Sequence, residues 1–96
     1  MAAYYIVGLE VMDTGEFEEY RRLVAPMVDR YGGSYVVRGD AQETVEGDWT
    51  PNRLVILECD SMERLKSWYE SDEYRPVMAI RRRSAISKAV IVEDVV

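Results

Sequence analysis

The chain has 96 residues, enough for one hydrophobic core and too few for two, so we expect a single domain over residues 1–96. Its 18 acidic and 12 basic residues give a net charge of −6, which disfavours nucleic acid and anionic membranes as partners. Histidine is absent, which excludes Ser-His-Asp and Cys-His catalytic systems and metal sites that contain histidine.

The remaining composition is typical of a soluble protein, and we expect it to use neither a cofactor nor a metal. Cys59 is the single cysteine, so no intrachain disulfide can form, as is typical of a reducing compartment. No apolar run approaches the roughly 20 residues that span a bilayer, and the N-terminus lacks the pattern of a secretory signal. We therefore expect a cytoplasmic protein. No residue spacing suggests a metal site.

The first third of the chain predicts a strand followed by a helix. Residues 4–12 alternate between two apolar sets, the pattern of a strand. Asp13 has the position of an N-cap, with Glu16 in capping-box spacing, and apolar residues then recur at steps of three and four. Pro26 predicts a kink in this helix, and the pair at residues 32–33 (GG) predicts its end.

Two further strands are predicted around a central loop. Residues 34–38 alternate, which places Tyr35 and Val37 on one face against Val36 and Arg38 on the other. Residues 42–46 are consistent with a short extension, and glycine, tryptophan and proline over residues 47–51 predict a loop. Residues 53–59 form a strand that is apolar on both faces, as is typical of a strand buried on both faces.

The last third predicts two helices and a strand. Ser61 is a plausible N-cap for one helix, and residues 71–73 open a second, short helix. The arginines at residues 81–83 close that helix, where we expect a solvated end, since cations favour a helix C-terminus. Residues 88–96 alternate again and predict the last strand.

The order strand, helix, strand, strand, helix, strand predicts an α+β fold. Its simplest form is the ferredoxin-like βαββαβ plait, a four-stranded antiparallel sheet with helices on one face. Because both faces of the first and third strands carry large apolar side chains, the uncovered face of the sheet stays apolar. Exposed apolar surface costs about 25 cal/mol per Å². Two-fold pairing is the commonest way to cover it, so we expect a homodimer through the open sheet face.

Three segments resemble a known family. They are residues 32–39 (GGSYVVRG), 45–53 (VEGDWTPNR) and 68–74 (WYESDEY). Together with the rest of the chain they are similar to the family called domain of unknown function 1330, within the dimeric α/β-barrel superfamily. The resemblance implies a dimer whose two sheets form a barrel-like interface, with a cavity between sheet and helices in each subunit.

The superfamily includes cofactor-free monooxygenases, lactone isomerases, haem-degrading enzymes and proteins without known chemistry. Many members carry histidine before the paired glycines, where this chain has Tyr31. That departure argues against a histidine base at the helix end and against haem ligation by histidine.

Five residues of the family motif are candidates for a site: Arg38, Glu46, Trp49, Arg53 and Tyr74. Glu46 is the candidate catalytic base, because burial can raise the pKa of a carboxyl toward neutrality. The arginines suit a carboxylate ligand. The structural alternatives are a solvated Glu46, and salt bridges of Arg38 to Asp40 or Glu46 and of Arg53 to Glu46 or Asp48. Trp49 is either a lid over the cavity or a packing residue of its loop, and Tyr74 either orients a ligand or belongs to the core.

Three functions are compatible with these residues. The first is a small-molecule enzyme, an isomerase or a cofactor-free oxygenase, that acts on an anionic aromatic or lactone-like metabolite. The second is a module that binds such a ligand without turnover. The third is a purely structural homodimer, which predicts a filled core without a cavity.

Overall fold

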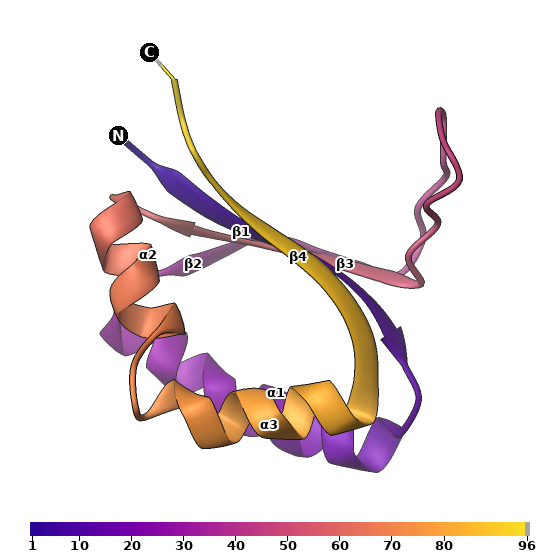
Figure 1. The fold of residues 1–96 in the computed structure, drawn as a ribbon, viewed down its shortest axis with the longest axis horizontal. Coiled ribbons are helices and arrows are strands. Elements are labelled where there is room, and N and C mark those ends of the chain that lie inside the picture. The colour runs from indigo at the N-terminus through magenta and orange to yellow at the C-terminus, as the bar shows by residue number, and fades with distance from the viewer. Residues whose placement is uncertain (96) are drawn as a thin grey trace.

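The structure, a computed structural model, describes residues 1–95 and contains four strands and three helices. In chain order these are β1 (Ala3–Val11), α1 (Thr14–Arg30), β2 (Ser34–Gly39), β3 (Arg53–Cys59), α2 (Met62–Tyr69), α3 (Tyr74–Ser84) and β4 (Ala85–Glu93). The strands pair antiparallel in the order β2-β3-β1-β4. All three helices cover one face of the sheet (Figure 1). The predicted α+β plait with a four-stranded antiparallel sheet is confirmed.

The ends of α1 follow from local chemistry. The side chain of Asp13 accepts a hydrogen bond from the backbone N–H of Glu16 at 3.0 Å, which satisfies one of the free donors of the first turn. The helix continues through Pro26 as one element and ends before Gly32, whose φ of +75° lies in the left-handed region that glycine adopts without strain.

Two predicted segments differ from the structure. The last strand, β4, spans Ala85–Glu93 instead of residues 88–96, of which residue 96 lies outside the described residues. Residues 42–46 form no strand extension and belong to the loop between β2 and β3. The polar side chains of this segment bond within the loop, where Thr44 Oγ1 donates to the carbonyl oxygen of Trp49 at 2.9 Å. These local bonds take the place of a strand ladder.

The predicted alternation of β2 is wrong because the strand contains an irregularity. Tyr35 pairs with Leu57 and Val37 pairs with Ile56, so the register shifts at Val36. A bulge of this kind turns the side chains that follow it. Tyr35 and Arg38, predicted on opposite faces, consequently both line the helix-covered side of the sheet.

The hydrophobic core lies between the sheet and the helices, with an aromatic cluster near its centre. Trp68 and Tyr74 have ring centroids 4.5 Å apart, and Tyr5 meets the Trp68 ring edge-on at 5.4 Å. Burial of each such ring stabilises the fold by roughly 1.5–3 kcal/mol. The cluster joins α2 and α3 to the central strand β1. No helix within residues 1–95 has the length and apolar character needed to cross a membrane.

The other face of the sheet is uncovered and apolar. Even-numbered residues of β1, β3 and β4 point to this open face. Its apolar side chains include Tyr4, Ile6, Leu54, Ile56, Ile86, Val90 and Val92. Val90 exposes 60% of its surface and Ile86 exposes 58%. The predicted open apolar face is therefore present.

Candidate functional site

A cavity of about 920 Å³ lies between α1 and the helix-covered side of the sheet. This volume falls within the range of small-molecule sites. Small residues of α1, Gly15 and Ala25, face it and leave space beneath the helix. Apolar and aromatic side chains form most of its wall: Tyr5, Val7, Leu9, Phe17, Tyr20, Val24, Tyr35, Val55 and Leu57.

The charged lining of the cavity is positive on balance, although the protein as a whole is negative. Five arginines and three carboxylates line it, a net charge of +2. Each carboxylate pairs with one arginine: Glu18 with Arg21 at 2.8 Å, Glu19 with Arg22 at 2.5 Å and Asp40 with Arg53 at 3.0 Å. Arg38 and Arg81 form no ion pair within residues 1–95.

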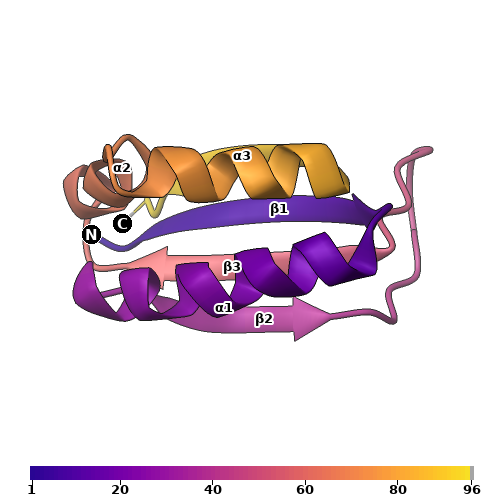
Figure 2. The ribbon, with the colours of Figure 1, turned by 90° about the horizontal axis from the view of Figure 1, so that it is seen from below.

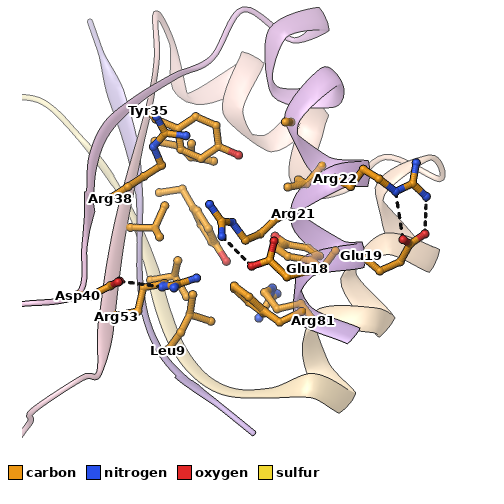
Figure 3. A pocket seen from close by; sticks show the side chains of 18 of the residues that line it. Leu9, Glu18, Glu19, Arg21, Arg22, Tyr35, Arg38, Asp40, Arg53 and Arg81 are labelled. Carbon is orange, nitrogen blue, oxygen red and sulfur yellow. Dashed lines mark hydrogen bonds and ion pairs between the residues drawn. The ribbon is translucent and has the colours of Figure 1, made fainter. Parts of the chain in front are cut away.

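Arg81 is the buried cation of the site, with only 3% of its surface exposed. Its Nη1 donates to Ser87 Oγ at 2.6 Å, and its Nε has no hydrogen-bond partner within residues 1–95. Figure 3 shows the side chain at the end of the cavity away from Tyr35 and Arg38. Burial without an acidic partner is costly for a guanidinium. The fold thus holds a desolvated positive charge in the cavity wall.

Helical phase explains the position of Arg81. The buried residues of α3 are Tyr74, Val77, Arg81 and Ser84, spaced at three and four residues. The prediction of a solvated arginine run is therefore wrong for Arg81 and correct for Arg82 and Arg83, which are exposed. Sequence reasoning missed Arg81 because it grouped the three arginines by adjacency instead of by helical face.

Tyrosine hydroxyls accompany Arg81. Tyr5 Oη is buried and has no hydrogen-bond partner within residues 1–95, while the hydroxyls of Tyr20 and Tyr74 are 2.8 Å apart. Burial raises the pKa of Tyr5, although Arg81 opposes the shift, and burial also raises the pKa of Tyr20. The raised pKa keeps the Tyr5 and Tyr20 hydroxyls protonated at physiological pH. Burial acts to lower the pKa of Arg81, but the surrounding tyrosines, Tyr5, Tyr74 and Tyr20, outweigh it and raise that pKa, so the guanidinium stays charged.

Two of the predicted ligand-binding residues reach the cavity. Arg38 stacks over the Tyr35 ring at 4.7 Å and forms neither of the salt bridges considered for it. Arg53 pairs with Asp40 instead of Glu46 or Asp48, and its guanidinium lies 5.4 Å from the centre of the Phe17 ring. Both side chains point into the cavity from the sheet (Figure 3).

The other three predicted residues lie elsewhere. Tyr74 is fully buried in the core, does not line the cavity, and touches the site through its hydroxyl, which contacts Tyr20 and lies close to Arg81. Glu46 and Trp49 belong to the loop between β2 and β3, which extends on the side of the sheet away from the helices (Figure 1). Neither lines the cavity, and Trp49 packs against Gly8 on the open face. The proton-transfer role of Glu46 stays a prediction.

The first testable consequence concerns Arg81 and stability. We expect Arg81→Met to leave the free energy of unfolding unchanged or to raise it by about 1 kcal/mol, because it removes a buried unpaired charge. Urea unfolding at fixed protein concentration measures this, with the exposed Arg82→Met as the matched control, expected within about 0.5 kcal/mol of the unsubstituted protein. A loss above about 1 kcal/mol in Arg81→Met would instead assign the arginine a structural role.

Comparison with solved structures identifies the same fold in proteins of low sequence identity. A protein of unknown function from Rhodopseudomonas palustris has a TM-score of 0.78 at 17% identity, over 98% of this chain and 82% of the other. SnoaB, a cofactor-independent oxygenase from Streptomyces nogalater, has a TM-score of 0.68 at 15% identity, over 97% and 92%. A dimeric ferredoxin-like protein of unknown function from Thermobifida fusca has a TM-score of 0.65 at 16% identity, over 96% and 90%.

These likenesses show the fold. A search of curated proteins finds no match. At the level of sequence, residues 2–95 match one family, described as a domain of unknown function (DUF1330). The match spans nearly the whole chain and agrees with the resemblance seen in its glycine, tryptophan and tyrosine segments. The protein belongs to the DUF1330 family.

Proposed function

We propose that this protein binds a small organic anion with an aromatic body in the cavity between α1 and the sheet. The observation that carries the proposal is Arg81, a buried guanidinium in the cavity wall with no acidic partner within residues 1–95. A ligand oxyanion supplies the missing partner, and a charge-assisted hydrogen bond is strong where water is excluded.

The lining also indicates how such a ligand would lie. Its anionic group would meet Arg81 and the free hydroxyl of Tyr5, which both need an acceptor. Its rings would pack between Phe17, Tyr20 and Tyr35. Arg38, which forms no salt bridge in the described part of the chain, would meet a second polar group at the other end of the cavity (Figure 3). A cavity with converging donors counts against the purely structural alternative.

Binding is tested with 2-naphthoate and its neutral counterpart 2-naphthylmethanol, which has the same rings. We expect naphthoate to raise the melting temperature, by mass action, and the alcohol to leave it unchanged. Arg81→Met should weaken naphthoate binding at least about tenfold by calorimetry, equivalent to about 1.4 kcal/mol. Arg82→Met should not change it. Equal binding of acid and alcohol, or full affinity in Arg81→Met, would contradict the proposal.

A catalytic role is the second candidate, and the likeness in fold to a cofactor-independent oxygenase favours it. Isomerisation of a ketone or lactone and cofactor-free oxygenation can share a first step, the loss of a proton from carbon to give an enolate. A buried guanidinium stabilises the developing enolate oxygen. Each carboxylate in the lining pairs with an arginine, which leaves Glu46 as the proposed base; this role requires its loop to leave the open side of the sheet.

The shared step is tested by deuterium exchange at the acidic carbon of 2-tetralone in D₂O, followed by NMR. The protein should exchange this position faster than buffer, and Arg81→Met should lower the rate about 10²-fold, the usual effect of removing one oxyanion donor. Glu46→Gln should also slow exchange if Glu46 accepts the proton. Exchange no faster than in buffer, or unaffected by both substitutions, would leave binding as the function.

We also propose that the protein is a homodimer that buries the open face of the sheet against a second copy, as a dimeric α/β barrel. Val90, Val92 and Ile86 stand exposed together on β4 of this face. Burial of such a patch is favourable at about 25 cal/mol per Å². The Thermobifida fusca protein of the same fold is described as dimeric.

The dimer is tested by sedimentation velocity over a dilution series. Val90→Glu places a charge within the proposed interface, next to Ile6 of the central strand, and should convert the protein to a folded monomer. Val95→Glu makes the same chemical change at a residue that is 89% exposed and outside the strands, and should leave the dimer intact. Two variants with equal dimer stability would contradict burial of this face.

A further inference from the structure

The loop between β2 and β3, residues 40–52, forms an arm that leaves the sheet on the side away from the helices. Figures 1 and 2 show it projecting beyond the ends of β2 and β3. The arm is ordered by its own contacts. The hydroxyls of Thr44 and Thr50 are 2.9 Å apart, and Gln42 Nε2 donates to the carbonyl oxygen of Pro51. Val45, near its tip, is 89% exposed.

The arm packs against Gly8, near the middle of β1, through Trp49 and Pro51. A Cβ at Gly8 would lie 2.3 Å from Trp49 Cζ2 and 3.0 Å from Pro51 Cβ, so the indole is in direct contact with the strand backbone. A residue with a side chain at position 8 would leave no room for the indole. Trp49 is nevertheless 45% exposed, because no side chain of residues 1–95 covers its outer side.

Trp49 shares its surface with the proposed dimer interface. Gly8 lies two residues from Ile6 on the same face of β1, a separation of roughly 7 Å along the strand. Stacked sheets lie about 10 Å apart, the thickness of the side-chain layer between them. An indole lying on the backbone of Gly8 occupies that layer, so a second sheet that covers Ile6 also meets the exposed side of Trp49.

We propose that Trp49 anchors this dimer: its exposed side packs against the second copy of the chain, and the arm lies along the edge of that copy. The inference rests on the homodimer proposed above. Trp49 adds a rigid aromatic side chain to the apolar open face, and such side chains are the usual interface hot spots. This would explain why the arm projects from the open face: the side of the arm that faces the sheet's open face can be contacted only by a partner bound to that face.

A second copy suits this surface better than an acidic or basic partner. The open face carries both signs of charge, with Lys88 beside Gly8 and with Glu10 and Glu58 on the same face. In a two-fold interface the same patch meets itself, so a patch with both signs can pair its own charges. The apolar residues between them supply a surface that is likewise complementary to itself.

Two substitutions test the anchor from opposite sides. Trp49→Ala removes the indole. Gly8→Ala retains the indole but displaces it from the strand, because the added methyl group would overlap the Trp49 ring. Both should weaken the dimer at least about tenfold in sedimentation velocity, the effect of losing a hot-spot side chain. Met12→Ala is the matched control, because Met12 is exposed, apolar and outside the strands, and it should leave the dimer unchanged.

Each outcome decides between the two dimer proposals. A wild-type dimer whose strength is unchanged in Trp49→Ala and Gly8→Ala overturns the anchor and leaves the homodimer standing. A wild-type monomer overturns both. A dimer that is weaker in Trp49→Ala and Gly8→Ala but unchanged in Met12→Ala supports the anchor.

Fluorescence gives a second measurement that does not depend on the folding of Gly8→Ala. The chain has two tryptophans, and Trp68 is buried in the core. We expect acrylamide quenching of the wild-type protein to increase when the dimer is diluted to monomer, because Trp49 becomes accessible. Trp49→Phe, which retains Trp68 alone, should show no such increase. Quenching of the wild type that stays constant through dissociation would overturn the proposal.

Discussion

The core, the cavity and the open face all depend on the alternation of side chains along the central strand, β1. Its odd-numbered residues, such as Tyr5 and Leu9, face the helices and line the cavity, whereas Ile6 and Gly8 face the open side. β1 is paired on both edges, with β3 and with β4. A shift of one residue would exchange the two faces and remove the core, the cavity and the seat of Trp49 together. One strand therefore positions both proposed surfaces.

Arg81 is the point at which stability and function oppose each other. An amphipathic helix would place an apolar residue at this position of α3, between Val77 and Ser84. The protein instead buries a charge there, beside the free hydroxyl of Tyr5. A buried charge that costs stability and has no acidic partner within residues 1–95 is the expected form of a binding site built before its ligand arrives.

The cavity and the arm meet at one ion pair. Asp40 is the first residue of the arm, and Arg53 is the first residue of β3 after it. Their side chains form an ion pair at 3.0 Å, and both line the cavity. The irregularity at Val36 turns Arg38 to the same side. The connection between β2 and β3, with the residues at its two ends, thus supplies a charged pair to the cavity on one side of the sheet and Trp49 to the open face on the other.

The sequence by itself determined the order of the elements, the caps at Asp13 and Ser61, and the apolar open face, because these follow from periodicity and from bonds between near neighbours. It identified Arg38 and Arg53 as polar residues next to strands. It could not place Glu46 and Trp49, since the direction of a 13-residue loop depends on contacts such as that of Trp49 with Gly8 across the sheet. Only the tertiary structure decided that Arg81 is buried without an acidic partner among residues 1–95, because that depends on which carboxylates packing brings within reach.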